Sequence, residues 1–215
     1  MCNKKTIWLI IILIILAPLV IGCNHNHCLF TMPPVTADTV ITSPDELGFQ
    51  FDKSTGTITR YNGKANEVII PEFFDIDGEI VQVKIIGKDV FMGKDELNSV
   101  KIPKSITEIG NRAFLLCGKL SKVEFEENSN LIIIKSEAFS CCSKLTEIII
   151  PDSVTEIEDE VFNCCSAIRT ITIGENVKLG KYLFNPGNDL FKYTYYGYIR
   201  AAGTYKYINK KWVRQ

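Results

Sequence analysis

The stretch VKIPKSITEIGNRAFLLCGKL (Val100–Leu120) returns with the same spacing as IIIPDSVTEIEDEVFNCCSAI (Ile148–Ile168). Each begins with alternating apolar residues that end at a Pro, and continues with an Ile, a Phe and a final Leu or Ile at matching distances. Alternating apolar residues predict a strand, and Pro suits a strand end because it donates no ladder hydrogen bond. Repetition of such a unit predicts a repeat architecture.

Two markers follow this unit along the chain. The strand marker starts at Val68, Val100, Val123, Ile148 and Ile171, and the aromatic marker is Phe91, Phe114, Phe139, Phe162 and Phe184. The spacing between successive copies increases from 23 to 25 residues for both markers, and it does so at the same copy, near the polar loop Asn128-Ser129-Asn130. No single unit can bury these apolar residues, so neighbouring units must stack. We predict a mainly β solenoid of about five coils of 22–25 residues with terminal β caps. The stretch after each Phe is expected to form a short helical or 3-10 turn.

The unit resembles the BspA-like class of bacterial leucine-rich repeats through its Ile-Pro, Ile-Gly…Ala-Phe and Cys-x-x-Leu pieces. The resemblance extends from Val68 to about Gly187 and implies an α/β-type leucine-rich-repeat solenoid over residues 68–188. In the fifth copy Asn185-Pro186-Gly187 replaces the Cys-x-x-Leu piece, so a cap is expected to begin there. The resemblance also implies a surface protein that engages host matrix proteins or other cells, which is an analogy based on fold.

Both ends of the solenoid carry candidate caps. Phe49–Asp52 and Thr57–Tyr61 have the pattern of two strands around a Gly-containing turn, and predict a hairpin within an N-terminal cap of residues 49–67. Residues 189–215 are predicted to be an aromatic C-terminal cap, because six of the eight tyrosines and Trp212 fall there. Tyr193, Tyr195 and the neighbouring aromatics alternate as in a closing hairpin. The alternative interpretation is a ligand platform, since Tyr and Trp are enriched at interaction hot spots.

The first 23 residues have the composition of an export signal. Lys4 and Lys5 precede the uncharged stretch Thr6–Ile21, and Val20-Ile21-Gly22-Cys23 resembles a bacterial lipobox. We predict a lipoprotein signal peptide over residues 1–22 and lipidation of Cys23, where each buried acyl CH₂ contributes about 0.8 kcal/mol. The expected location is the bacterial cell envelope, with the protein lipid-anchored and exposed at the surface. An uncleaved signal anchor is the alternative, and it too exports the rest of the chain.

Residues 23–48 are predicted to be a flexible tether, because their polar, proline-containing composition cannot bury enough apolar area to offset the entropy of ordering. His25, His27 and Cys28 lie close together in this segment, and such clusters can bind metal. No second ligand cluster accompanies them in the sequence. We therefore interpret them as part of a solvated linker and predict neither a metal site nor a cofactor.

The cysteines within the repeats occur at matching positions in successive copies. Cys117, Cys142 and Cys165 each lie three residues after the aromatic marker, so they are expected to stack as a small apolar ladder inside the solenoid. Cys141 and Cys164 share a register one position earlier, in coils expected to lie about 4.8 Å apart. A disulfide between these two is a hypothesis that the spacing allows in an exported protein.

Neither catalysis nor nucleic-acid binding is predicted. With 24 basic and 25 acidic residues the formal net charge is −1, which gives no electrostatic footprint for nucleic acid. Phosphate-loop, metalloprotease and nucleophile-elbow motifs are absent from the sequence, and both histidines lie in the tether. One repeat concentrates the carboxylates Asp152, Glu156, Glu158, Asp159 and Glu160, which we interpret as a solvated acidic face and not as a glycosidase pair.

A binding module is the function that the pattern favours, since solenoids present extended surfaces along their strands. The candidate contact residues point outward beside the buried strand positions: Ile69, Lys101, Lys122, Glu124, Glu147, Ile149, Thr170 and Thr172. The expected partner is a protein, with a host extracellular matrix protein as the candidate. An ordinary solvent-facing sheet is the alternative for these residues, and a structural or accessory lipoprotein of the envelope is the alternative function.

Overall fold

The computed structural model describes residues 42–184, 190–197 and 200–215, with the exception of the side chains of Leu190 and Tyr193. All of them belong to one unit, Val40–Gln215. The predicted signal peptide, Cys23 and the His25–Cys28 cluster lie outside the described residues, as do residues 185–189.

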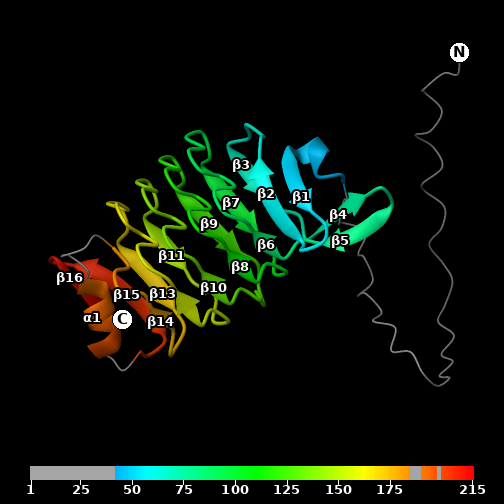
Figure 1. Cartoon of the computed structure of the whole chain (residues 1–215). Coiled ribbons are helices and arrows are strands. Elements are labelled where there is room, and N and C mark those ends of the chain that lie inside the picture. The colour runs from blue at the N-terminus through cyan, green and yellow to red at the C-terminus, as the bar shows by residue number, and fades with distance from the viewer. Residues whose placement is uncertain (1–41, 185–189, 198–199) are drawn as a thin grey trace, which may run out of the picture. The chain divides into compact units, whose positions relative to one another are not determined.

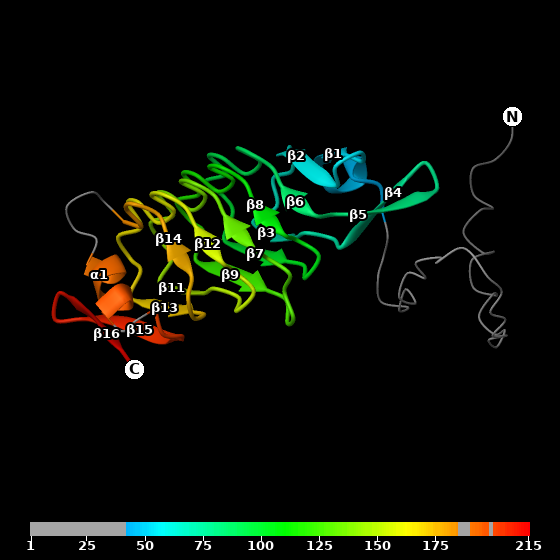
Figure 2. The same cartoon turned by 60° about the horizontal axis from the view of Figure 1, so that its bottom comes forward.

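Two rows of short strands run along the solenoid (Figures 1 and 2). The first row is one seven-stranded sheet, in the order β1 (Phe49–Asp52), β2 (Thr57–Tyr61), β6 (Ile85–Ile86), β8 (Glu108–Ile109), β10 (Ile133–Ile134), β12 (Glu156–Ile157) and β14 (Lys178–Leu179). β1 and β2 pair antiparallel, and every later pair in this sheet is parallel and in register. This row therefore joins every coil to the next.

The second row is divided into two sheets. One contains β3 (Glu67–Ile69), β7 (Ser99–Ile102) and β9 (Lys122–Phe125), all parallel. The other contains β11 (Glu147–Ile149), β13 (Thr170–Ile173), β15 (Gly203–Ile208) and β16 (Lys211–Arg214). A separate hairpin of β4 (Phe73–Ile76) and β5 (Glu79–Gln82) interrupts the first coil and extends from its side (Figure 1). The predicted mainly β solenoid is confirmed.

A column of phenylalanine rings passes through the core. The rings of Phe91 and Phe114 stack with centroids 4.8 Å apart, those of Phe114 and Phe139 are 5.0 Å apart, and those of Phe139 and Phe162 are 6.0 Å apart. All four side chains are fully buried. Since the aromatic marker is one residue per coil, the column confirms that the repeats stack in the predicted register.

The cysteine ladder lies beside this column. The side chains of Cys117, Cys142 and Cys165 are buried, as predicted. Their Sγ atoms donate hydrogen bonds of 3.1, 3.3 and 3.0 Å to the backbone oxygens of Phe91, Phe114 and Phe139 respectively, each in the preceding coil. Burial raises the pKa of Cys117 to about 12, so this thiol remains protonated and able to donate at neutral pH.

Cys141 and Cys164 lie at the edge of the coils, half-buried and exposed respectively. All five described cysteines are thiols, so the hypothesised disulfide between these two is not formed in this structure. Their side chains nevertheless interact through a hydrogen bond. This bond with Cys141 is the main reason why the pKa of Cys164 is raised, and burial raises that pKa further.

The N-terminal end follows the predicted hairpin, since β1 and β2 have the expected bounds. The end of the predicted tether differs from the expectation of a flexible segment. Asp45–Leu47 forms the 3-10 helix η1, and the carbonyl of Pro44 accepts hydrogen bonds from the N–H groups of Leu47 and Phe49, at 3.2 and 2.8 Å. These local bonds order the chain just before its first strand.

The C-terminal end combines a helix with the predicted closing hairpin. The alternation seen around Tyr193 and Tyr195 predicted strands, and this prediction is wrong, because Leu190–Gly197 forms helix α1. Phe191 and Tyr195 are four residues apart, so they share one face of the helix, and both are fully buried. β15 and β16 form the closing hairpin, which pairs antiparallel with β13.

Candidate binding surface

The predicted contact residues lie along the second row of strands. In the first sheet of this row, Ile69, Lys101 and Glu124 are register partners on β3, β7 and β9, and Lys122 lies two positions before Glu124. In the other sheet, Glu147 pairs with Thr170 and Ile149 pairs with Thr172. The structure thus places the eight residues in two groups of four, on two separate sheets.

Two apolar side chains are prominent on this surface. Ile69 is 70% exposed and Ile149 is 64% exposed. The charged residues around them pair with each other: Lys122 Nζ lies 2.6 Å from Glu124 Oε1, and Lys101 Nζ lies 3.0 Å from Glu126 Oε1. These ion pairs are at the surface and contribute little to stability. These four charges therefore cancel, whereas Glu67 on β3 and Glu147 on β11 have no ion-pair partner among the described residues.

The second row of strands is interrupted between β9 and β11. The two strands belong to different sheets, and no backbone hydrogen bond joins Lys122–Phe125 to Glu147–Ile149. The same two coils are joined elsewhere, because β10 pairs with β12 and the N–H of Phe139 donates to the oxygen of Val161 at 3.0 Å. We call this interruption the sheet break.

The sheet break coincides with the longer copy of the repeat. Ile102 precedes Glu108, and Ile150 precedes Glu156, by six residues, whereas Phe125 precedes the equivalent Ile133 by eight. The additional residues are in Glu126–Asn130, and this segment stays close to the preceding coil. Its N–H groups at Glu126 and Asn130 donate to Ile102 and Lys104, both at 3.0 Å. In the second row, the coil that contains β9 is therefore hydrogen-bonded to the preceding coil and lacks ladder bonds to the following coil.

Two strand residues expected in the core are partly uncovered at the break. Val123 and Phe125 are only half-buried, whereas Ile148 and Ile150, their equivalents in the next coil, are 1% exposed. A cavity of about 650 Å³ opens over them, with Ile149, Ile150 and Thr172 on its other side. Only the anomalous repeat spacing could have indicated this cavity from the sequence.

The rim of this cavity is acidic. Its lining contains Glu124, Glu126, Glu127 and Asp152, and contains no Lys or Arg. Glu127 and Asp152 are exposed, and within the part of the chain that the structure describes they have no ion-pair partner. The cavity joins three predicted contact residues, Glu124, Ile149 and Thr172, with residues that the strand pattern did not single out.

A smaller cavity of about 310 Å³ lies where the last coil meets the C-terminal hairpin, lined by Phe162, Arg169 and Trp212 among others. Arg169 is engaged in the fold, since its Nη1 donates to the oxygens of Ser166 and Ile168, both at 2.8 Å. The aromatic residues of this end mostly lie inside: Phe191, Tyr195, Tyr205 and Trp212 are buried. They close the last coil and do not form an exposed platform.

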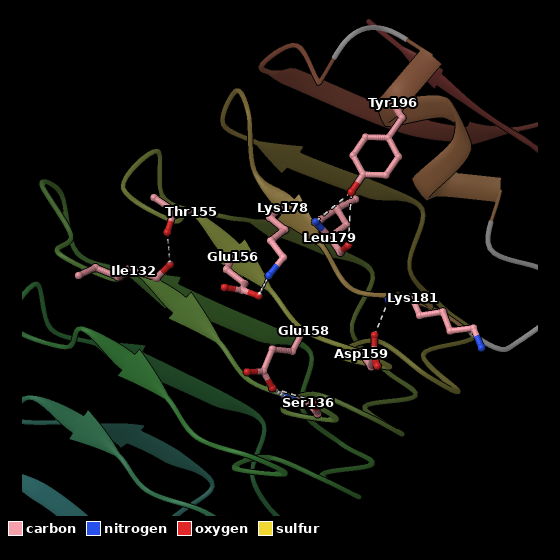
Figure 3. A network of polar contacts seen from close by, with 10 residues as sticks. All are labelled: Ile132, Ser136, Thr155, Glu156, Glu158, Asp159, Lys178, Leu179, Lys181 and Tyr196. Atoms are coloured by element: carbon pink, nitrogen blue, oxygen red, sulfur yellow. Dashed lines mark hydrogen bonds and ion pairs between the residues drawn. The ribbon is translucent and has the colours of Figure 1, made fainter.

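Three of the five carboxylates predicted to form an acidic face connect the fourth coil, which contains β11 and β12, to its neighbours (Figure 3). Glu156 lies 2.6 Å from Lys178 of the next coil, and Glu158 accepts hydrogen bonds of 3.0 and 2.8 Å from the N–H and hydroxyl of Ser136 in the preceding coil. Asp159 accepts a hydrogen bond from the N–H of Lys181. The prediction that they are merely solvated is therefore incomplete.

Among the described residues there is no group of three or more His, Cys, Asp or Glu side chains placed to hold a metal ion. Within the same residues, no helix has the length and apolar character needed to cross a membrane.

Comparison with known proteins identifies the repeats. The sequence model of the BspA type leucine rich repeat region matches six copies over residues 77–210. No curated protein matches the chain.

Solved structures similar to the chain include a leucine-rich repeat protein from Bacteroides capillosus ATCC 29799, 32% identical with a TM-score of 0.51, over 58% of this chain and 91% of that one. A leucine rich cell surface protein from Faecalibacterium prausnitzii A2-165 is 30% identical with a TM-score of 0.49, over 60% of this chain and 41% of that one. The repeat match spans more than half of the sequence, and the chain therefore belongs to the BspA-type leucine-rich-repeat family.

Proposed function

We propose that this protein is a lipid-anchored protein of the bacterial cell surface that binds a protein partner through its second row of strands, in adhesion to host matrix proteins or to other cells. The family and the solenoid fold are typically non-enzymatic. The function proposed is accordingly binding and not catalysis.

The observation that carries the proposal is the strand surface with its exposed Ile69 and Ile149. Solenoids use such extended surfaces to bind partners, and apolar side chains in a polar surround are the usual anchors of a protein interface. Thr170 and Thr172 on the same surface are half-buried, and Lys101 and Lys122 are already paired with Glu126 and Glu124, which reduces the cost of desolvating these charges when a partner covers the strands.

The anchor rests on the sequence Val20–Cys23. Replacement Cys23→Ala is expected to abolish incorporation of radiolabelled palmitate into the protein and to release it from the membrane fraction, since no acyl chain can then be attached. Replacement Cys28→Ala, five residues along, is the matched control and should leave both unchanged. If the unaltered protein takes up no label and Cys23→Ala leaves membrane retention unchanged, the chain is held by an uncleaved signal anchor instead.

The binding surface is tested with purified extracellular matrix proteins, immobilised and probed with the protein in solution. We expect Ile69→Glu and Ile149→Glu each to weaken binding at least tenfold, because a buried, unpaired carboxylate would replace an apolar anchor. Ile132→Glu is the control, since Ile132 is 51% exposed but lies just before β10, in the other row of strands. Equal binding by all three variants would contradict the proposed surface.

The choice between adhesion and an accessory role inside the envelope depends on exposure of the protein on intact cells. Protease treatment of such cells is expected to remove the repeats. Complete protection, together with no matrix protein bound by the unaltered chain, would overturn the adhesion proposal in favour of a structural role.

A further inference from the structure

We propose that the sheet break between β9 and β11 is a recognition site for an extended peptide segment that carries a large apolar side chain next to Lys or Arg. The proposal rests on the proposed function in that the segment belongs to the protein partner. It adds the chemistry of that partner, and it places the main contact at one point of the strand surface.

The size and the floor of the cavity determine the apolar part of the ligand. Its volume of about 650 Å³ lies within the range of specific binding pockets, which is about 300–1,000 Å³. Val123, Phe125 and Ile149 supply an apolar floor that the fold leaves partly uncovered. In the other coils the residues equivalent to Val123 and Phe125 are buried, so the partial exposure of these two side chains is a feature of this coil and not of the repeat.

The rim determines the charge of the ligand. Four carboxylates line the cavity without a Lys or Arg among the lining residues. Glu124 and Glu126 are paired with Lys122 and Lys101 on the strand surface. Glu127 and Asp152 have no such partner among the described residues. A guanidinium or ammonium group of a ligand can pair with these two side chains without displacing an existing ion pair.

The backbone at the break favours an extended ligand. On β9 the N–H of Glu126 points to the preceding coil, so the N–H and C=O groups of Val123 and Phe125 point to β11. By the same alternation, Ile150 donates to Thr172 of the next coil, and the groups of Glu147 and Ile149 point to β9. These polar groups have no ladder partner, because β9 and β11 belong to different sheets, and an extended ligand exposes backbone donors and acceptors that can bond those groups which the parted strands leave accessible. β9 and β11 remain in contact with each other, so the ligand lies over the break and is not inserted as a strand between them.

Residues 1–23 contain Lys4 and Lys5, but they form the predicted signal peptide and lipidation site. The other segments of this chain outside the described residues are poor occupants. Residues 24–41 contain neither Lys nor Arg, and neither do residues 185–189. The acidic rim would gain no ion pair from either. A second copy of the chain does carry basic residues, at Lys210 and Lys211, and self-association is therefore one outcome that the experiment must separate.

The experiment measures binding of fluorescein-labelled nonapeptides to the full-length protein by fluorescence anisotropy. Three peptides are compared: one with a central Phe flanked by Arg, one with the Phe changed to Ser, and one with the Arg residues changed to Glu. The first is expected to bind at least tenfold more tightly than the other two, and raised salt should weaken it, because part of the recognition is electrostatic.

The matched variants are Glu127→Lys combined with Asp152→Lys, and Glu46→Lys combined with Glu175→Lys. All four positions are exposed, so the fold should tolerate them, and the two double variants have the same net charge. We expect the first double variant to bind the Phe–Arg peptide at least tenfold more weakly than the unaltered protein does, and the second to bind it with unchanged affinity. Ile149→Ser is expected to weaken it as well, without altering the salt dependence.

The outcomes separate this proposal from the proposed function. Absence of saturable binding up to roughly 1 mM, the weak end of specific affinity, or equal loss in both double variants, would overturn the peptide site. Binding of a matrix protein that depends on Ile69 but is unaffected by Glu127→Lys with Asp152→Lys would leave the strand surface standing and remove the break as its recognition point. Concentration-dependent dimers in sedimentation equilibrium that only the first double variant abolishes would identify a second copy as the occupant, and would also overturn the proposal.

Discussion

Replacement Phe139→Ala is expected to lower the free energy of unfolding by about 3–5 kcal/mol, the range for removing a fully buried phenylalanine ring. The ring is 0% exposed and lies between those of Phe114 and Phe162, with centroids 5.0 and 6.0 Å away. Removal of the ring eliminates both ring–ring contacts and leaves a cavity, because the stacked neighbouring rings cannot move far enough to fill the space. A domain of ordinary stability has about 5–15 kcal/mol in total, so this one substitution threatens the fold.

The position of Phe139 next to the sheet break strengthens this expectation. The third coil, which contains β9 and β10, and the fourth, which contains β11 and β12, lack the β9–β11 ladder. They are joined instead by the β10–β12 pair, by backbone hydrogen bonds such as that from Phe139 to Val161, and by the stacked rings of Phe139 and Phe162. The Cys165 thiol adds a hydrogen bond to the Phe139 oxygen at 3.0 Å. In a solenoid each coil is stabilised mainly by its immediate neighbours. Weakening this junction should therefore uncouple the two halves as well as destabilise them.

Urea denaturation followed by circular dichroism measures the effect. Phe139→Ala should move the midpoint to lower urea and broaden the transition or divide it into two steps, because two-state behaviour fails when coils uncouple. Ile132→Ala is the control, since its side chain is 51% exposed and a surface truncation changes stability by about 0.5 kcal/mol or less. Equal midpoint shifts in the two variants would show that the ring column is not the core of the solenoid.

The stacking of the coils was predictable because it follows from one repeated pattern. Periodic Phe and Cys positions predicted a buried ring column and a buried thiol ladder, and both are present at Phe91–Phe162 and Cys117–Cys165. Every copy repeats the same evidence, so an error in one copy would conflict with the others. The bounds of the first hairpin were predictable for a local reason, since a Gly-containing turn separates two alternating segments.

The helix at the C-terminus was not predictable from the same kind of evidence. Alternating tyrosines are compatible with a strand, but Phe191 and Tyr195 also have the four-residue spacing of a helix face. The competing patterns are equally short, and the choice is made by packing. As a helix, the segment buries both rings and lets the Tyr195 hydroxyl donate to the oxygen of Gly174 and accept from the N–H of Val177, both at 2.9 Å.

The candidate site was predictable only in part. Alternation identifies which side chains point outward, and it correctly assigned Ile69 and Ile149 to the surface. It does not report whether two neighbouring strands remain hydrogen-bonded, because that depends on loops elsewhere in the coil. The two-residue lengthening after Phe125 was visible in the sequence, but its consequence, a cavity bordered by Glu127 and Asp152, needed the three-dimensional arrangement.

Replacement Gly110→Ala is expected to lower the free energy of unfolding by about 1–3 kcal/mol, the usual cost of overpacking. A methyl group at this position would lie 2.8 Å from the Gly87 carbonyl carbon, 2.9 Å from the Ile86 oxygen and 2.9 Å from the Lys88 nitrogen. These are backbone atoms of the preceding coil, so they cannot move aside as a flexible side chain would. The N–H of Gly110 also donates to that Ile86 oxygen at 2.7 Å, and separating the coils would lengthen this bond.

The matched control for this close approach is Gly174→Ala. Its added methyl group would meet Asp152 Cα at 3.4 Å, an ordinary contact, and its φ is not in the left-handed region. Gly174→Ala should therefore be neutral or stabilise by about 0.4–1 kcal/mol, because Ala restricts the unfolded chain more than Gly does. If the urea midpoints of the two variants shift together, backbone crowding is not what selects glycine at position 110. If only Gly110→Ala lowers the urea midpoint, the close approach of the neighbouring coil is the reason why this copy of the repeat requires glycine after the Ile. The third and fourth coils hold Lys135 and Glu158 at the equivalent position, so glycine is not required there. In the last coil the equivalent residue is Gly180, where an added methyl group would again meet backbone of the preceding coil, at 2.5 Å from the Glu158 carbonyl carbon and 2.6 Å from the Asp159 nitrogen.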